Sequence, residues 1–212
     1  MKKILLTTFT FLSFIGLSSA QDFNTDFDAK FSIGAKAGLN LSNVYNTNGE
    51  AFSTDPKFGF GVGAFATIPF GEFLAFQPEI LISQKGFQGT GFILGSTYSL
   101  TRTTTYLDFP FLFALRPTQF LTFVMGPQYS FLLNQKDVFG SATTTIEQET
   151  EFKKDNIRKD TLCFTGGLDI NLNKLILSGR IGWDLLANNG SGDSQTPRYK
   201  NFWYQATIGY RF

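Results

Sequence analysis

The stretch FSIGAKAGLNL, residues 31–41, carries an apolar side chain at every second position. Its odd positions, from Phe31 to Leu41, are all apolar, whereas its even positions hold Ser, Gly, Lys, Gly and Asn. A period of two is the side-chain period of a β-strand, whose successive side chains point to opposite faces. The stretch therefore predicts a strand with one apolar and one polar face.

The same alternation recurs along the rest of the chain. It covers residues 58–68, 74–83, 99–115, 121–131, 162–172, 175–185 and 201–212, which makes eight predicted strands. After Gln21 no run of 18 apolar residues occurs, and this excludes further transmembrane helices.

The connections between these segments alternate in length. Short links are expected near 69–72, 116–119 and 173–174, and long polar ones near 42–57, 86–97, 134–160 and 187–200. Short turns at one end and long loops at the other are typical of outer-membrane barrels. We predict an all-β fold: an eight-stranded antiparallel up-and-down transmembrane β-barrel with short periplasmic turns and long extracellular loops.

Composition decides which face points outward. Hydrophobic residues make up 42% of the chain, charged residues only 17%, and Phe alone occurs 26 times. An eight-stranded barrel has room inside only for side chains, so the large aromatic set does not fit there. The polar face holds mostly Gly, Ser, Thr and Ala, which is too few charges for a surface in water. We expect the apolar face to meet lipid; the alternative is a soluble, lipocalin-like ligand-binding barrel.

The N-terminus predicts export. Lys2 and Lys3 precede an apolar run, residues 4–17, and small residues at Ser18 and Ala20, the pattern of a secretory signal peptide. We expect residues 1–20 to be a cleaved signal peptide, 21–30 a short periplasmic segment and 31–212 the barrel, in the cell outer membrane. Gln21 rather than Cys follows the cut, which argues against a lipoprotein.

Several chemistries are excluded by composition. The chain has no His and one Cys, Cys163, so it lacks a His-based triad, a His-ligated metal and an internal disulfide. Its 18 basic and 17 acidic residues nearly balance, which offers no field for nucleic acid. We expect no enzyme activity, no catalytic, cofactor or metal site, and no nucleic-acid partner. The glycines at 59, 61 and 63 are interpreted as space for bulky neighbours such as Phe65.

Ionisable side chains on the polar face form the one candidate site. The predicted inward set is Lys36, Glu79, Asp108, Asp169, Arg180 and Asp184. We interpret it as a structural network of paired charges that fills the lumen. The alternative is a proton relay or ion pathway. Trp183, Tyr204, Tyr106 and Tyr210 are candidate aromatics at the membrane interface.

Four motifs resemble a known family. Residues 76–86, FQPEILISQKG, and 106–112, YLDFPFL, are similar to strands of the PorT-like outer-membrane β-barrel domain of Bacteroidota, with Asp108 where Glu is usual. Residues 35–40, AKAGLN, and 126–129, GPQY, also fit. The resemblance covers the chain after the leader and implies no particular task. It also implies that the barrel-assembly machinery recognises the terminal aromatics Tyr210 and Phe212 during insertion; the alternative is an ordinary last strand.

The expected function is a structural or protein-interaction role: envelope integrity, adhesion or an accessory role in secretion. The lumen is expected to be too narrow for bulk transport; a small-solute or ion channel or transporter is the alternative. Besides lipid, a protein partner is expected at the loop 134–160, whose residues 143–149 are β-prone. A protruding hairpin there could bind by strand addition.

Overall fold

The computed structural model describes residues 30–46, 54–93, 96–141, 144–149, 158–188 and 199–212. The predicted signal peptide, 1–20, and residues 21–29 lie outside them. The strands are β1 (Ser32–Asn46), β2 (Thr54–Pro69), β3 (Leu74–Ile93), β4 (Ser96–Leu115), β5 (Leu121–Ser141), β6 (Thr144–Glu149), β7 (Asp160–Leu172), β8 (Leu175–Asp184) and β9 (Tyr199–Arg211). No helix in these ranges is long and apolar enough to span a bilayer.

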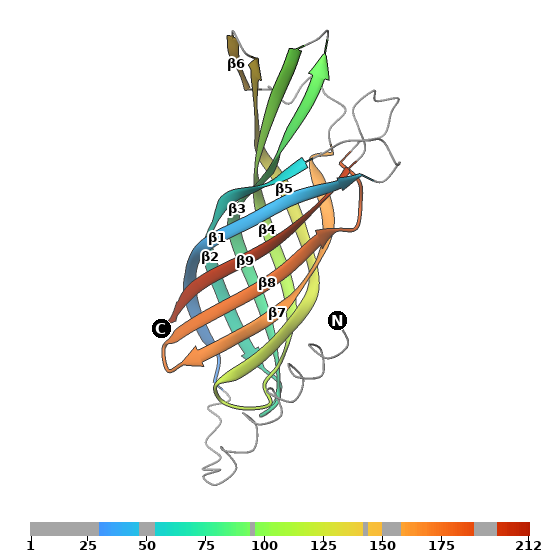
Figure 1. Cartoon of the computed structure of the whole chain (residues 1–212). Coiled ribbons are helices and arrows are strands. Elements are labelled where there is room, and N and C mark those ends of the chain that lie inside the picture. The colour runs from blue at the N-terminus through green and yellow to red at the C-terminus, as the bar shows by residue number, and fades with distance from the viewer. Residues whose placement is uncertain (1–29, 47–53, 94–95, 142–143, 150–157, 189–198) are drawn as a thin grey trace, which may run out of the picture.

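Eight of these strands close into an antiparallel barrel (Figure 1). The sheet order is β4-β3-β2-β1-β9-β8-β7-β5-β6, and pairing of β4 with β5 closes the circuit. The first and last barrel strands pair along their length, from Gly34 with Arg211 to Asn46 with Tyr199. Closure leaves no unpaired edge in the wall, as a strand in hydrocarbon requires. The predicted barrel is confirmed, and β6 is an additional strand that pairs only with β5.

The barrel wall has an apolar outer face and a polar inner face, as predicted. Apolar side chains such as Phe113 and Ile208, each 62% exposed, cover the outside, whereas the facing polar set is buried. A soluble barrel would have the reverse arrangement, since water would then meet the polar face. The apolar exterior therefore excludes the lipocalin-like alternative.

The two ends of the barrel differ in their connections. Tight turns join β2 to β3, β4 to β5 and β7 to β8, at the positions expected for short links. At the other end, however, the predicted long loop at 86–97 is wrong. There β3 continues to Ile93, β4 begins at Ser96, and these two residues pair. The polar sequence suggested a loop, but a strand in water can keep its hydrogen-bond ladder without an apolar face.

These long strands carry the sheet beyond the barrel wall. β5 continues to Ser141 and pairs with β6 from Lys136–Glu149 to Ser141–Thr144. Figure 1 shows β6 and the adjoining ends of β3 and β4 standing above the wall. We call the part of β3, β4, β5 and β6 that stands above the wall the extracellular extension.

A β-bulge in β5 sets which side chains point inward near its upper end. The register with β4 pairs Tyr106 with Leu132 but Thr105 with Asn134, which leaves one extra residue in β5. Below the bulge Leu132 is buried, and above it Asp137 is buried. The residues of β5 that point inward therefore have even numbers below the bulge and odd numbers above it. An extra residue in one strand has this effect because side chains alternate. The bulge thereby turns Asp137 into the lumen.

Glycines leave room for two large rings in the interior. The ring of buried Phe65 lies over Gly34, its partner across β1 and β2. A Cβ at Gly34 would approach that ring to 2.3 Å, and one at Gly182 would approach Trp203 equally closely. The space for Phe65 thus comes from Gly34 and not from the run 59–63 that the sequence suggested; Gly61 instead adjoins the amide of Gln205.

Candidate functional site

All six predicted lumenal residues are buried inside the barrel, but they form two groups and not one network. Lys36, Glu79, Asp169 and Arg180 lie together nearer the short-turn end. Asp108 and Asp184 lie higher, with a cation that the sequence analysis did not include. We call these groups the lower tier and the middle tier, and a third group above them the upper tier.

The lower tier contains two cations and two carboxylates. Arg180 binds Asp169 through both terminal nitrogens, at 2.6 and 3.0 Å, and its second terminal nitrogen lies 3.8 Å from Glu79. Lys36 pairs with the other oxygen of Glu79, and Gln77 donates to Glu79 at 3.0 Å. Because burial removes these charges from water, their mutual pairing is what makes the arrangement tolerable.

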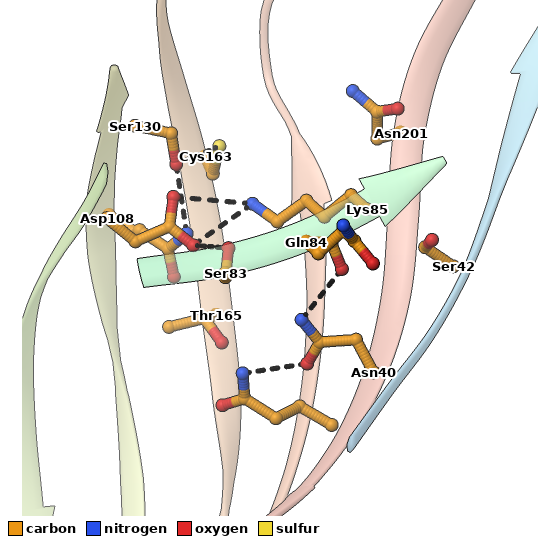
Figure 2. Close-up of polar contacts among 12 residues, drawn as sticks. Asn40, Ser42, Ser83, Gln84, Lys85, Asp108, Ser130, Cys163, Thr165 and Asn201 are labelled. Atoms are coloured by element: carbon orange, nitrogen blue, oxygen red, sulfur yellow. Dashed lines mark hydrogen bonds and ion pairs between the residues drawn. The ribbon is translucent and has the colours of Figure 1, made fainter. Parts of the chain in front are cut away.

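The middle tier is built around Lys85. Its ammonium nitrogen lies 3.3 Å from an Asp108 oxygen and 3.7 Å from the centre of the Trp203 ring. Ser83 donates to Asp108 at 2.5 Å, and Figure 2 shows Lys85 and Ser83 converging on that carboxylate. The aromatic face and the carboxylate together replace the water that an ammonium group loses on burial.

Asp184 completes the middle tier without a cation of its own. No salt bridge to it occurs within the described ranges. It accepts hydrogen bonds from the backbone and side-chain nitrogens of Asn201, at 3.0 and 2.5 Å. The thiol of Cys163 donates to it at 3.1 Å. Cys163 is thus a hydrogen-bonding partner of the network.

The upper tier lies at the base of the extracellular extension, where Asp137 already pairs with Gln148 of β6. Arg102 binds Asp137, its register partner across β4 and β5, at 2.8 and 2.6 Å. It also donates to the Tyr199 hydroxyl at 3.0 Å. The rings of Phe87 and Tyr199 meet edge to face at 5.4 Å between their centres. This tier lies at the end of the lumen opposite the short turns.

Three charged members of the interior were missed from the sequence. Lys85 shares the odd parity of Glu79 and Ser83 on β3, and Arg102 the even parity of Asp108 on β4. Parity could therefore have identified both. Asp137 could not be found in this way, because the bulge in β5 reverses its parity.

The charged side chains of the interior are paired with one another and with neighbouring polar groups. Its carboxylates are engaged by cations, amides, hydroxyls or the Cys163 thiol. Lys85 and Asp108 are each only 2% exposed, so a solute has no direct access to them. No group of Cys, Asp and Glu in the described part of the chain is placed to hold a metal ion.

The terminal aromatics lie on the outer surface at the short-turn end. Tyr210 and Phe212 stack edge to face at 5.7 Å, and the Phe212 backbone nitrogen donates to Ile33 at 2.9 Å. Trp183 and Tyr204 also face outward. Tyr106 does not: it is buried in the lumen beside Lys85, so its interpretation as an interface aromatic is wrong. It occupies an inward, even position of β4.

A closed eight-stranded barrel with an apolar exterior and a side-chain-filled interior defines a class, the small outer-membrane β-barrels. The model of the outer membrane protein beta-barrel domain family matches residues 19–186. The chain belongs to this family and is located in the cell outer membrane. Its surroundings are therefore lipid. The comparison with curated proteins finds no match.

Solved structures with a similar fold are distant in sequence. The attachment invasion locus protein Ail of Yersinia pestis is 13% identical, with a TM-score of 0.48, over 86% of this chain and 99% of Ail. Neisserial surface protein A is 11% identical, with a TM-score of 0.40, over 86% and 97% of the two chains. OprG of Pseudomonas aeruginosa is 13% identical, with a TM-score of 0.39, over 85% and 95%.

Proposed function

We propose that this outer-membrane barrel is a sealed anchor with a structural or protein-interaction role, and that it presents its extracellular extension to a protein partner. The observation that carries the proposal is the contrast between the two regions. The lumen holds three tiers of buried, paired side chains, whereas the sheet continues past the wall to β6, whose outer edge pairs with no other described strand.

The tiers argue against a channel or bulk transporter. A solute moving through the lumen would have to separate Arg102 from Asp137, Lys85 from Asp108 and Arg180 from Asp169 in turn. Breaking one buried ion pair costs several kcal/mol, about 3–5 in measured cases. A pathway that breaks three such pairs is a poor conductor, and the interior also offers no catalytic role.

The edge of β6 supports the interaction role. β6 stands last in the sheet order and pairs with β5 alone among the described strands. An exposed edge carries free N–H and C=O groups on which an extended segment of another protein can form a further strand. The partner proposed for the region 134–160 is thus one that binds through an extended segment.

A shortened hairpin tests this role. Replacing residues 138–147 by Asn-Gly joins Asp137 to Gln148, which are register partners, through a turn suited to a hairpin. The measurement is crosslinking on intact cells followed by isolation of the barrel. The partner should be recovered with the wild type but not with this variant.

The matched control shortens the neighbouring hairpin by joining Gly91 to Tyr98, also register partners, through Asn-Gly. This control keeps β6 and should keep the partner. Equal recovery from wild type and both variants, or equal loss from both variants, would contradict the interaction proposal.

We further propose the route by which the chain reaches the membrane. Residues 1–20 act as a cleaved signal peptide, and the barrel-assembly machinery recognises the outward-facing Tyr210 and Phe212. The motifs at 76–86 and 106–112 support a place in the PorT-like, Bacteroidota-type branch of the family. The intact mass of the protein from purified outer membranes tests the cleavage, because a chain retaining residues 1–20 would be heavier.

A further inference from the structure

The short-turn end of the barrel opens into a cavity of about 920 Å³, which we call the periplasmic vestibule. Four cationic side chains line it: Lys30 precedes β1, Arg116 follows β4, Lys174 lies in the turn between β7 and β8, and Arg211 ends β9. The carboxylate of Asp169 also lines the vestibule. It is already bound by both terminal nitrogens of Arg180.

Of these cations, Arg116, Lys174 and Arg211 form no salt bridge within the part of the chain that the structure describes. Arg116 donates to the Gly71 carbonyl at 3.1 Å, and Arg211 to the side-chain oxygen of Asn171 at 3.0 Å. Lys174 lies 5.8 Å from the centre of the Tyr210 ring. All of these partners are uncharged, and the one carboxylate that also acts on Arg211, Asp169, is shared with Arg180.

Both arginines also have unused hydrogen-bonding capacity. Their Nε atoms are buried and have no hydrogen-bond partner among the described residues, and neither has the nearby Thr67 hydroxyl. A buried donor without a partner is costly. Burial and the neighbouring Arg211 guanidinium lower the pKa of Arg116, so the two like charges repel each other. An anion between them would relieve the repulsion and satisfy the donors.

We propose that the periplasmic vestibule binds a small soluble ligand carrying at least two oxyanion groups, phosphate or carboxylate. Guanidinium groups bind such oxyanions through two parallel hydrogen bonds, and an ammonium group adds a point charge. The cavity volume is within the range of small-molecule sites, about 300–1,000 Å³. This ligand would enter from the periplasm, and its binding is independent of a partner at the extracellular extension.

Titration calorimetry tests the site with inorganic pyrophosphate as the probe. The full chain, folded in neutral detergent at low ionic strength, should bind one pyrophosphate. Arg116→Gln and Arg211→Gln should each weaken binding by at least about tenfold, and added salt should weaken it further. Arg158→Gln is the matched control, because Arg158 contacts the Ala187 carbonyl in the connection that follows β8, at the opposite end of the barrel.

The control should bind as wild type does, and heat-modifiable migration shows that each variant is folded. Absence of binding by the folded wild type, or equal loss in Arg158→Gln, would overturn the proposal.

A second variant identifies the source of the oxyanion groups. Asp22, Asp26 and Asp28 precede the first barrel strand in the sequence, and their carboxylates have the same chemistry as the proposed ligand. In a chain with all three changed to Asn, unchanged affinity for pyrophosphate supports a soluble ligand. Affinity that rises by about tenfold or more would mean that these carboxylates occupy the vestibule, which would overturn the soluble-ligand proposal.

Discussion

At the scale of single residues, Arg180 connects both carboxylates of the lower tier. It binds Asp169 in a two-pronged contact and lies near Glu79, while Lys36 completes the tier. Two cations facing two carboxylates leave the tier neutral. Removal of one cation leaves an uncompensated buried charge, so this side chain should matter more for stability than a surface arginine.

Arg180→Ala should therefore lower the free energy of unfolding by about 3–5 kcal/mol. Urea unfolding in lipid vesicles, followed by the fluorescence of Trp183 and Trp203, measures the change. Combining Arg180→Met with Asp169→Leu should recover much of the loss, because well-packed apolar residues can replace a buried pair. A loss in Arg180→Ala as small as that of an exposed substitution would show that the tier is hydrated.

Gly182 tests the packing of the middle tier. A Cβ at this position would lie 2.3 Å from the Trp203 ring, which is itself held against Lys85. Gly182→Ala should cost about 1–3 kcal/mol in the same unfolding experiment, as overpacking does. Gly179→Ala, on the same strand with nothing within 4 Å of the added carbon, should change stability by no more than about 0.5 kcal/mol. Equal effects would contradict the packing.

At the scale of elements, β9 combines a structural and a proposed targeting role. It closes the barrel against β1, and its terminal residue adds one backbone hydrogen bond, from Phe212 to Ile33. The Phe212 ring is 71% exposed, so it contributes little to packing inside the protein. We propose that the barrel-assembly machinery recognises this ring during insertion.

Deletion of Phe212 should reduce the amount of folded barrel in the outer membrane and leave the unfolding free energy of the folded fraction nearly unchanged. Heat-modifiable migration of membrane fractions measures the yield. Phe31→Ala is the matched control, since Phe31 is 63% exposed, next to β1 at the same end of the barrel. An undiminished yield after the deletion would support the alternative of an ordinary last strand.

The strands within the bilayer could be predicted from sequence, whereas of the extracellular extension only the hairpin that includes the β-prone residues 143–149 could be. Lipid on one face and a packed lumen on the other impose strict alternation, as in Phe31 to Leu41. Above the membrane both faces of a strand meet water, so this constraint is lost. Residues 86–97 consequently suggested a loop, although Ile93 and Ser96 pair. The bulge in β5, which reorients Asp137, leaves no mark in the alternation.

For the whole molecule, the sequence predicted which charged side chains point into the lumen but not which of them form ion pairs. Parity on each strand assigned Lys36, Glu79, Asp108, Asp169, Arg180 and Asp184 to the interior. Which of them meet depends on the stagger between strands, and the sequence does not contain that information in local form. The division into a lower and a middle tier, and the place of Lys85 between Asp108 and Trp203, follow from the closed register.

Three tiers of paired side chains stand between the two ends of the barrel, and we propose that they seal its lumen. Current through a planar lipid bilayer containing the folded protein tests it most directly. Parallel insertion of the Arg102→Ala and Arg180→Ala variants shows whether removing the plugging side chains opens a path. The account predicts no discrete current steps from the wild type. Uniform, reproducible steps from the folded wild type would contradict it and favour the channel alternative.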